Sequence, residues 1–233
     1  SVLSFCDGKT VKPMVSSMDH KRALDHDEGL NTGGMGTVAP NPYYTPAVAE
    51  RCMQEIFLPT VAAMQAEGCP FKGCLYFGLM LTPDGPKVIE YNCRFGDPET
   101  QVVLPLLESD LLTVMEATTN GTLDKTDVKF SDGAAACVIL ASGGYPLAYE
   151  KGKEITGLTA GQLDAADVTV YHAGTAIKDG RLVTNGGRVL GVTATANTLP
   201  DALKKAYAAT ESIHFDKLHK RSDIGARALA AME

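Results

Sequence analysis

Alternation of apolar and polar positions predicts extended segments early in the chain. Residues 2–6 and 9–15 are two extended runs joined by Asp7-Gly8, a dipeptide typical of two-residue hairpin turns. Residues 71–81 carry large apolar side chains mainly at every second position, which predicts a strand with one buried face. After a turn rich in Pro, Asp and Gly, residues 87–92 are the returning strand.

Helical spacing begins at Thr45-Pro46, which supplies a cap and a proline in the first turn. This helix is expected to end at Gly68 and to kink or split at Pro59. Further helices are predicted to start at Asp97-Pro98-Glu99 with Asp97 as the cap, at 109–119, and from Thr198 to about residue 213. Residues 16–41 show little periodicity and are predicted to be a long loop.

The second half of the chain is richer in predicted strands. Residues 134–141, 168–176, 181–184 and 188–193 are expected to be strands, and Asp179-Gly180 and Asn185-Gly186-Gly187 the turns of a meander. This change predicts an α+β chain with a boundary near residue 130, giving domains 1–130 and 131–233.

Composition then narrows the class of protein. The chain has 233 residues, 45% of them hydrophobic, a net charge of −7 and no apolar run long enough to cross a membrane. We therefore expect a globular cytoplasmic protein that binds neither nucleic acid nor membranes. The six cysteines lack zinc spacing and are expected to be reduced core thiols, and residues 217–221 to be a solvated basic patch.

The strand ending at Asn92 carries the first candidate chemistry. Glu90 and Asn92 fall on one face by the period of two, so a carboxylate and an amide oxygen can converge on one Mg²⁺. Arg94 would continue that face if the strand does, where it could steady a carboxylate or a phosphoryl group. The alternative is a solvent-facing strand ending in a polar turn.

The second candidate is the segment from Asp19 to Gly36. Lys21 and Arg22 supply positive charge, and residues 31–36 read Asn-Thr-Gly-Gly-Met-Gly. Its glycines would allow backbone N–H groups to cradle an anion, although the segment is not a P-loop. The alternative is a flexible surface loop.

Three segments in this order resemble the phosphoribosylamine–glycine ligase family of the ATP-grasp superfamily. They are Asp-His-Lys-Arg at 19–22, Asn-Thr-Gly-Gly-Met-Gly at 31–36 and Glu-Tyr-Asn-Cys-Arg-Phe-Gly-Asp-Pro-Glu at 90–99. Further matches lie at 141–146, 171–175 and 184–190, so the resemblance covers essentially the whole chain.

The resemblance implies an ATP-grasp C-terminal subdomain, an antiparallel sheet with helices, followed by a small β-rich domain with a helix. It implies that ATP phosphorylates glycine to glycyl phosphate, which 5-phosphoribosylamine attacks to give glycinamide ribonucleotide in purine biosynthesis. Carried over by position, Glu90 and Asn92 bind Mg²⁺ or Mn²⁺, and Arg94 is catalytic. The same comparison implies substrate contacts at Asp19, Lys21, Asn31, Thr32, Gly33, Gly34, Gly186, Gly187 and Arg188. For residues 186–188, a simple hairpin turn is the alternative.

The family also has parts that this chain lacks, namely an N-terminal domain and most of the ATP lid. We therefore expect a fragment whose partner is the missing N-terminal portion and which is inactive alone. Two other functions stay open: a different ATP-grasp ligase or carboxylase, and a non-catalytic binding module.

Overall fold

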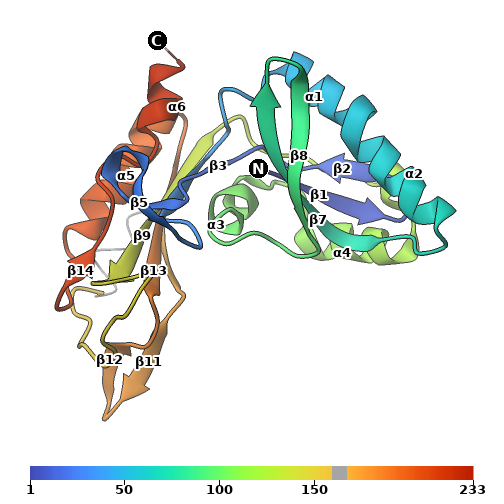
Figure 1. Ribbon diagram of the computed structural model, residues 1–233. Coiled ribbons are helices and arrows are strands. Elements are labelled where there is room, and N and C mark those ends of the chain that lie inside the picture. The colour runs from blue at the N-terminus through green and yellow to red at the C-terminus, as the bar shows by residue number, and fades with distance from the viewer. Residues whose placement is uncertain (159–166, 233) are drawn as a thin grey trace. The chain divides into compact units, whose positions relative to one another are not determined.

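The computed structural model describes residues 1–158 and 167–232 (Figure 1). Mixed helices and antiparallel sheets make this an α+β chain, as expected. It divides into two compact units that alternate along the sequence. Unit 1 comprises Ser1–Ser17, Pro40–Gly96 and Leu106–Asp132, and unit 2 comprises Met18–Ala39, Asp97–Pro105 and Gly133–Glu233. In the part of the chain that is described, no helix is both long and apolar enough to cross a membrane.

Unit 1 is built on a four-stranded antiparallel sheet in the order β2-β1-β7-β8. Its strands are β1 (Val2–Asp7), β2 (Val11–Pro13), β7 (Lys72–Thr82) and β8 (Gly85–Asn92). The two predicted hairpins are confirmed, but the first turn is longer than predicted because Cys6 pairs with Val11. The Asp7 carboxylate closes this turn by accepting the backbone N–H of Lys9 at 3.0 Å and of Thr10 at 2.7 Å.

One face of this sheet is covered by a long interrupted helix. It consists of α1 (Pro46–Cys52), a π-helical turn η2 (Met53–Phe57) and α2 (Leu58–Ala66). The predicted cap is confirmed, since the Thr45 hydroxyl accepts the Val48 N–H at 3.3 Å. The predicted interruption is confirmed too: Pro59 has no N–H to donate, and the π turn ends just before it. The shared core contains Val2, Cys6, Cys52, Ile56, Phe57, Val61, Leu75 and Phe77.

Helix α4 (Leu111–Asn120) contacts β1 and β7 from the other side of the sheet (Figure 1). The predicted helix is confirmed, with Asp110 as its cap and Gly121 ending it at φ 72°. The turn η4 (Leu123–Lys125) follows, and the Leu123 N–H donates to Asp7 at 3.1 Å. This bond ties the end of α4 to the β1–β2 turn.

Unit 2 contains a six-stranded antiparallel sheet. Its path runs β10 (Val168–His172), β13 (Arg188–Ala196), β9 (Ala134–Ser142), β6 (Gly36–Ala39) and β3 (Met18–Asp19), and β14 (Leu218–His219) also pairs with β9. Two hairpins stand apart from it: β4 (Arg22–Leu24) with β5 (Glu28–Asn31), and β11 (Thr175–Lys178) with β12 (Arg181–Thr184).

Two sequence predictions fail in this sheet. Residues 16–41 are not a long loop, because β6 lies in the sheet and is wholly buried, which removes the alternation that marks a half-exposed strand. The meander is wrong as well: β13 pairs with β10 and β9, and β12 pairs only with β11 among the named strands. Local turn signals specified the β11–β12 hairpin but not the long-range partner of β13.

Helix α5 (Leu199–Thr210) packs on β9 and β13, where small side chains such as Ala136 and Ala194 allow close approach. Its predicted cap is confirmed, since the Thr198 hydroxyl accepts the Asp201 N–H at 3.3 Å. The shorter elements are η1 (Asp25–Asp27), α3 (Thr100–Val103), η3 (Leu104–Leu106) and α6 (Ala226–Ala230).

Three local predictions are corrected. Asp97 does not cap a helix, because α3 begins at Thr100 and Asp97 instead accepts the Gln101 side chain at 3.0 Å. The basic patch is wrong at Arg221, which is 1% exposed and is paired with Asp223 at 2.7 Å. Two of the six free cysteines, Cys69 and Cys93, are exposed and so are not core thiols.

Candidate active site

In unit 1, the end of β8 brings together the two predicted metal ligands. Glu90 pairs with Gly78 and Asn92 with Tyr76, and a register shift between Gly78 and Leu79 leaves Ile89 as an extra residue. The Asn92 amide nitrogen lies 3.4 Å from Glu90 Oε1, so the two side chains share one face as predicted. A half-turn of the amide would bring its oxygen to the same place.

The glycine at position 78 makes room for the Glu90 side chain. A Cβ on Gly78 would lie 2.8 Å from Glu90 Cγ, closer than carbon atoms approach without displacement. The Glu90 side chain therefore lies across the backbone of the neighbouring strand, beside Asn92.

This pair fits a hard divalent cation that is completed by other ligands. Mg²⁺ is commonly held by one or two protein oxygens with waters and substrate phosphates filling the remaining positions. No group of three or more His, Cys, Asp or Glu side chains arranged for a metal occurs in residues 1–158 or 167–232. A site at Glu90 and Asn92 would thus depend on its phosphate ligand.

Arg94 lies beyond the end of β8, so strand alternation does not fix its direction. Its guanidinium donates to the Phe95 carbonyl at 2.9 Å and is otherwise exposed. The Phe95 ring packs edge-on against Phe5, with ring centroids 6.3 Å apart. The turn that carries Arg94 is therefore anchored to the sheet while its charge faces solvent.

In unit 2, the Asn31–Gly36 segment is folded back on residues 20–21. The Thr32 N–H and hydroxyl donate to the Lys21 carbonyl at 2.7 and 2.9 Å. The Gly34 N–H donates to the Thr32 hydroxyl at 2.9 Å, and the Met35 N–H to the His20 carbonyl at 2.8 Å. The segment is an ordered turn and not a flexible loop.

Two side chains from later in the sequence, Tyr145 and Arg188, form hydrogen bonds to this segment. We call these two side chains the clasp. The Tyr145 hydroxyl accepts the Gly33 N–H at 2.9 Å. Arg188 Nη1 donates to the carbonyls of Gly33 at 2.8 Å and of Asp97 at 2.9 Å. Arg188 Nη2 also lies 3.3 Å from the Asp97 carboxylate. Arg188 therefore holds the Asn31–Gly36 segment to residue 97 through its backbone hydrogen bonds.

These contacts correct the predicted anion cradle. The N–H groups of Thr32, Gly33, Gly34 and Met35 all donate to protein acceptors and are not turned toward a ligand. Any ligand at this segment would be recognised by side chains such as those of Lys21 and Asn31, both exposed.

Beneath the segment lies a buried carboxylate, Asp19. Its side chain is 4% exposed and forms an ion pair with Lys21, Nζ to Oδ2, at 2.5 Å. Burial, followed by the charge of nearby Glu99, raises the pKa of Asp19 to about 6, although Lys21 opposes the shift. Such a carboxyl group can gain or lose a proton near neutral pH.

The adjacent His20 is held neutral. Burial, and then the charge of Arg221, lowers the pKa of His20 to about 4. Its Nε2 accepts the Gly225 N–H at 3.0 Å, which leaves Nδ1 to donate to the Gly36 carbonyl at 3.2 Å. His20 thus links this segment to the start of α6.

Residues 186 and 187 support the clasp through their backbone. Ser142 donates to both carbonyls, from Oγ to Gly186 at 2.8 Å and from N to Gly187 at 2.7 Å. A Cβ on Gly187 would lie 2.2 Å from the Tyr145 ring, so the ring packs directly on that glycine.

The structure adds Gly78, Glu99 and Tyr145 to the residues found from the sequence. Residues 141–146 carry part of the family resemblance, but nothing local links Tyr145 to a glycine 112 positions earlier. Glu99 was interpreted as a helix-start residue, although a carboxylate that is 2% exposed belongs to a site or a network.

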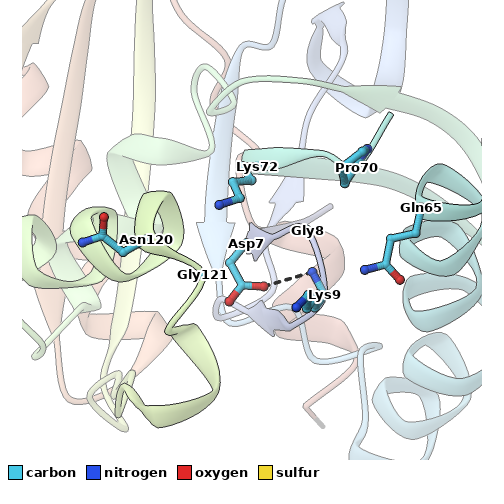
Figure 2. Close-up of a pocket in the computed structure, with 8 residues that line it drawn as sticks. All are labelled: Asp7, Gly8, Lys9, Gln65, Pro70, Lys72, Asn120 and Gly121. Atoms are coloured by element: carbon cyan, nitrogen blue, oxygen red, sulfur yellow. Dashed lines mark hydrogen bonds between the residues drawn. The ribbon is translucent and has the colours of Figure 1, made fainter. Parts of the chain in front are cut away.

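A polar pocket of about 340 Å³ also lies in unit 1, lined by residues 7–9, Gln65, Pro70, Lys72, Asn120 and Gly121. Figure 2 shows Asp7 between Lys72 and Lys9, bonded to the Lys9 backbone. The Lys72 ammonium donates to the Thr119 carbonyl at 2.7 Å. None of the predicted site residues lines this pocket.

Both halves of the chain are similar in sequence to known proteins. Residues 1–100 match the ATP-grasp (A) domain of phosphoribosylglycinamide synthetase, and residues 135–227 match its C domain. A phosphoribosylamine–glycine ligase from Synechocystis is 50% identical over 231 residues, covering 98% of this chain and 55% of that protein. A trifunctional purine biosynthetic protein from Gallus gallus is also 50% identical, with 99% and 23% covered.

Solved structures show the same similarity at the level of the fold. A phosphoribosylamine–glycine ligase from Thermotoga maritima has a TM-score of 0.85 at 38% identity, covering 96% of this chain and 54% of that one. A biotin carboxylase subunit of pyruvate carboxylase has a TM-score of 0.62 at 15% identity, which shows a shared fold only. The chain spans about half the length of the ligases that it matches.

Proposed function

Because the chain belongs to the phosphoribosylamine–glycine ligase family, we propose that it contributes to the ATP-dependent joining of glycine to 5-phosphoribosylamine. The product would be glycinamide ribonucleotide, with ADP and phosphate released. The proposal includes a cytoplasmic location and a division along the sequence into an ATP-grasp part, 1–130, and a C-terminal domain, 131–233. The compact units depart from this division, since residues 18–39 and 97–105 belong to unit 2. The observation that carries it is the convergence of Glu90 and Asn92 on one face of β8.

In the proposed reaction, a glycine carboxylate oxygen attacks the γ-phosphorus of ATP and ADP leaves. The amine of phosphoribosylamine then attacks the carbonyl carbon of glycyl phosphate, the C–O bond to phosphate breaks, and the amine loses a proton. Glu90 and Asn92 would hold Mg²⁺ or Mn²⁺, which neutralises phosphate charge when bound. Arg94, exposed beyond β8, would orient the carboxylate or the acyl phosphate.

The substrate site proposed in unit 2 rests on the clasped segment. Asn31 and Lys21 are exposed at this surface, Lys21 with its ammonium against Asp19, while Thr32, Gly33 and Gly34 form the backbone turn beside them. Arg188, Gly186 and Gly187 would contribute by holding this surface in place, since their contacts are to the protein itself.

The test is made on the complete ligase that contains this chain, together with the N-terminal portion that we propose as its partner. ADP release should require both glycine and 5-phosphoribosylamine. Glu90→Gln should lower kcat/KM by about 10²-fold or more because one metal ligand is lost. Glu50→Gln is the matched control, since Glu50 is an exposed residue of α1.

The same assay separates the alternatives. ADP release driven by bicarbonate or another amino acid, and not by glycine, would indicate a different ATP-grasp enzyme. Unchanged activity in Glu90→Gln would overturn the metal assignment and favour a binding module.

A further inference from the structure

Three charged side chains lie near one another at the clasped segment of unit 2, since Lys21 contacts Asp19 and the charge of Glu99 acts on Asp19. Asp19 and Glu99 are buried carboxylates, at 4% side-chain and 2% residue exposure respectively. Lys21 is half exposed and places its ammonium 2.5 Å from Asp19 Oδ2. With the side chains in their usual charge states, this cluster of Asp19, Lys21 and Glu99 has one more negative than positive charge.

Three separate parts of the sequence bring these groups together. Asp19 lies in β3, where it pairs with Thr37 of β6. Glu99 directly precedes α3. Gly34 closes over Asp19 at φ +116°, and a Cβ there would lie 2.7 Å from Asp19 Oδ1 and 2.5 Å from Pro98. Only a glycine lets the segment cover the carboxylate so closely.

Asp19 has capacity for a proton. Its Oδ1 is buried and has no hydrogen-bond partner among the described residues, whereas Oδ2 faces Lys21. Burial and the neighbouring Glu99 charge both favour the protonated form, and they raise the pKa of Asp19 to about 6. The other charged groups at this segment are Asp97 and Arg188. They form an ion pair, so their opposite charges nearly cancel at Asp19.

The proposed reaction releases one proton when the amine attacks the acyl phosphate. We propose that the cluster takes up this proton, with Lys21 as the group that meets the amine and Asp19 as the acceptor behind it. The N–H proton passes to Lys21 as Lys21 gives one to Asp19. The N–C bond forms, the C–O bond breaks and inorganic phosphate leaves. Glu99 is a positioning residue, because the nearby charge of its carboxylate favours protonation of Asp19.

This inference rests on the proposed function, and the experiments below distinguish its failure from a failure of that function. In the complete ligase, Asp19→Asn should lower kcat by about 10²- to 10⁴-fold while the KM for ATP changes little. The acid limb of the pH–rate profile, expected near pH 6, should disappear. Glu99→Gln should move that limb to lower pH, since a like charge is removed.

Hydroxylamine separates the two chemical steps. It is a strong nucleophile toward acyl phosphates and needs no catalytic base, so it should trap glycyl phosphate as glycine hydroxamate. Asp19→Asn should retain hydroxamate formation while losing coupling to 5-phosphoribosylamine. Retained trapping also shows that the variant is folded and binds ATP and glycine.

The matched control is Asp127→Asn. Asp127 pairs with Lys129 at 2.8 Å with the same two-residue spacing, but both side chains are well exposed. Its removal should leave the rate and the pH profile unchanged.

An independent measurement is the carboxyl ¹³C titration of Asp19 in this chain. The midpoint should lie near 6 in the unmodified protein and lower in Glu99→Gln. An Asp19→Asn ligase with unchanged rate and pH profile, or an Asp19 midpoint near the ordinary value for aspartate, would overturn the inference. If the unmodified ligase shows no turnover that depends on glycine and 5-phosphoribosylamine, the proposed function fails instead.

Discussion

At the scale of single residues, two glycines make room for the carboxylates beside them. Gly78 leaves room for the Glu90 side chain, and Gly34 leaves room for Asp19. In both cases a methyl group would lie within 2.8 Å of the acidic side chain. The positions of the acidic groups therefore depend on residues that have no side chain of their own.

We expect Gly78→Ala to displace Glu90 while the fold is kept, because β7 accepts alanine at ordinary backbone angles. In the complete ligase with ATP, the affinity for Mn²⁺ should fall by about tenfold or more, since one of two protein ligands is lost. Electron paramagnetic resonance of free Mn²⁺ measures this. Met80→Ala, at an exposed position of the same strand, is the control and should bind Mn²⁺ normally.

Tyr145→Phe removes one hydroxyl from the clasp. The Gly33 N–H loses its acceptor, so its hydrogen exchange should accelerate by about fivefold, corresponding to ~1 kcal/mol. Mass spectrometry or NMR exchange at Gly33 provides the measurement. Tyr43→Phe, at an exposed tyrosine of unit 1, should leave this exchange unchanged. Equal exchange in Tyr145→Phe and the unmodified chain would show that the clasp does not hold the segment.

The two buried titrating groups predict opposite effects of pH on stability. Asp19 has a folded pKa of about 6, above its ordinary value of 3.8. Its contribution to the free energy of unfolding therefore falls as pH rises from about 4 to about 6. His20 has a folded pKa of about 4, below its ordinary value, so its contribution rises with pH between about 4 and 6.5.

The two contributions should largely cancel in the unmodified chain. Asp19→Asn should therefore reveal the His20 effect, and its unfolding free energy should rise between pH 4 and 6.5 by on the order of 3 kcal/mol relative to the unmodified chain. Urea denaturation at several pH values measures both proteins. Parallel pH curves for the two proteins would contradict this assignment.

At the scale of elements, helix starts follow the local sequence closely. Thr45, Asp110 and Thr198 each accept a backbone N–H three residues later, and two of these caps were predicted by residue. Such caps act within a single turn, so no distant contact is needed to specify them.

Asp110→Ala should lower the stability of the chain by about 1 kcal/mol, because the Thr113 N–H loses its cap and α4 packs on the central strands of unit 1. Thermal or urea denaturation measures the change. Asp84→Ala, at an exposed turn residue, is a suitable control. A loss as large in the control as in Asp110→Ala would argue against a capping effect.

Strands were less predictable than helices, for a specific reason. The hairpins around residues 7–10 and 179–180 were found because their turns are local. Strand β6 was missed because its four buried residues show no alternation. The partner of β13 was missed because Arg188 pairs with Ala141, 47 positions earlier, and not with a strand next to it in the sequence. Burial on both faces and pairing across long separations leave no short-range pattern.

At the scale of the whole molecule, the chain includes the proposed metal ligands but only about half the length of the ligases that it matches. We expect this chain alone to show no turnover of ATP, glycine and 5-phosphoribosylamine. Mn²⁺ should bind it weakly, with no saturation below about 1 mM, because two protein ligands without phosphates leave the ion mostly hydrated. Coupled ADP assays and Mn²⁺ titration test both expectations. Turnover by the isolated chain would contradict the first.

The sequence by itself determined the α+β class, the family, most helix starts and the pairing of Glu90 with Asn92 on one face. These features depend on near neighbours or on uninterrupted stretches of residues. Tertiary structure alone decided the role of Arg188, the link between Tyr145 and Gly33, and the burial of Asp19 beside Glu99. The partners in each of these contacts are 80 to 155 positions apart. Only folding brings such groups out of water and together, and that desolvation gives Asp19 its altered chemistry.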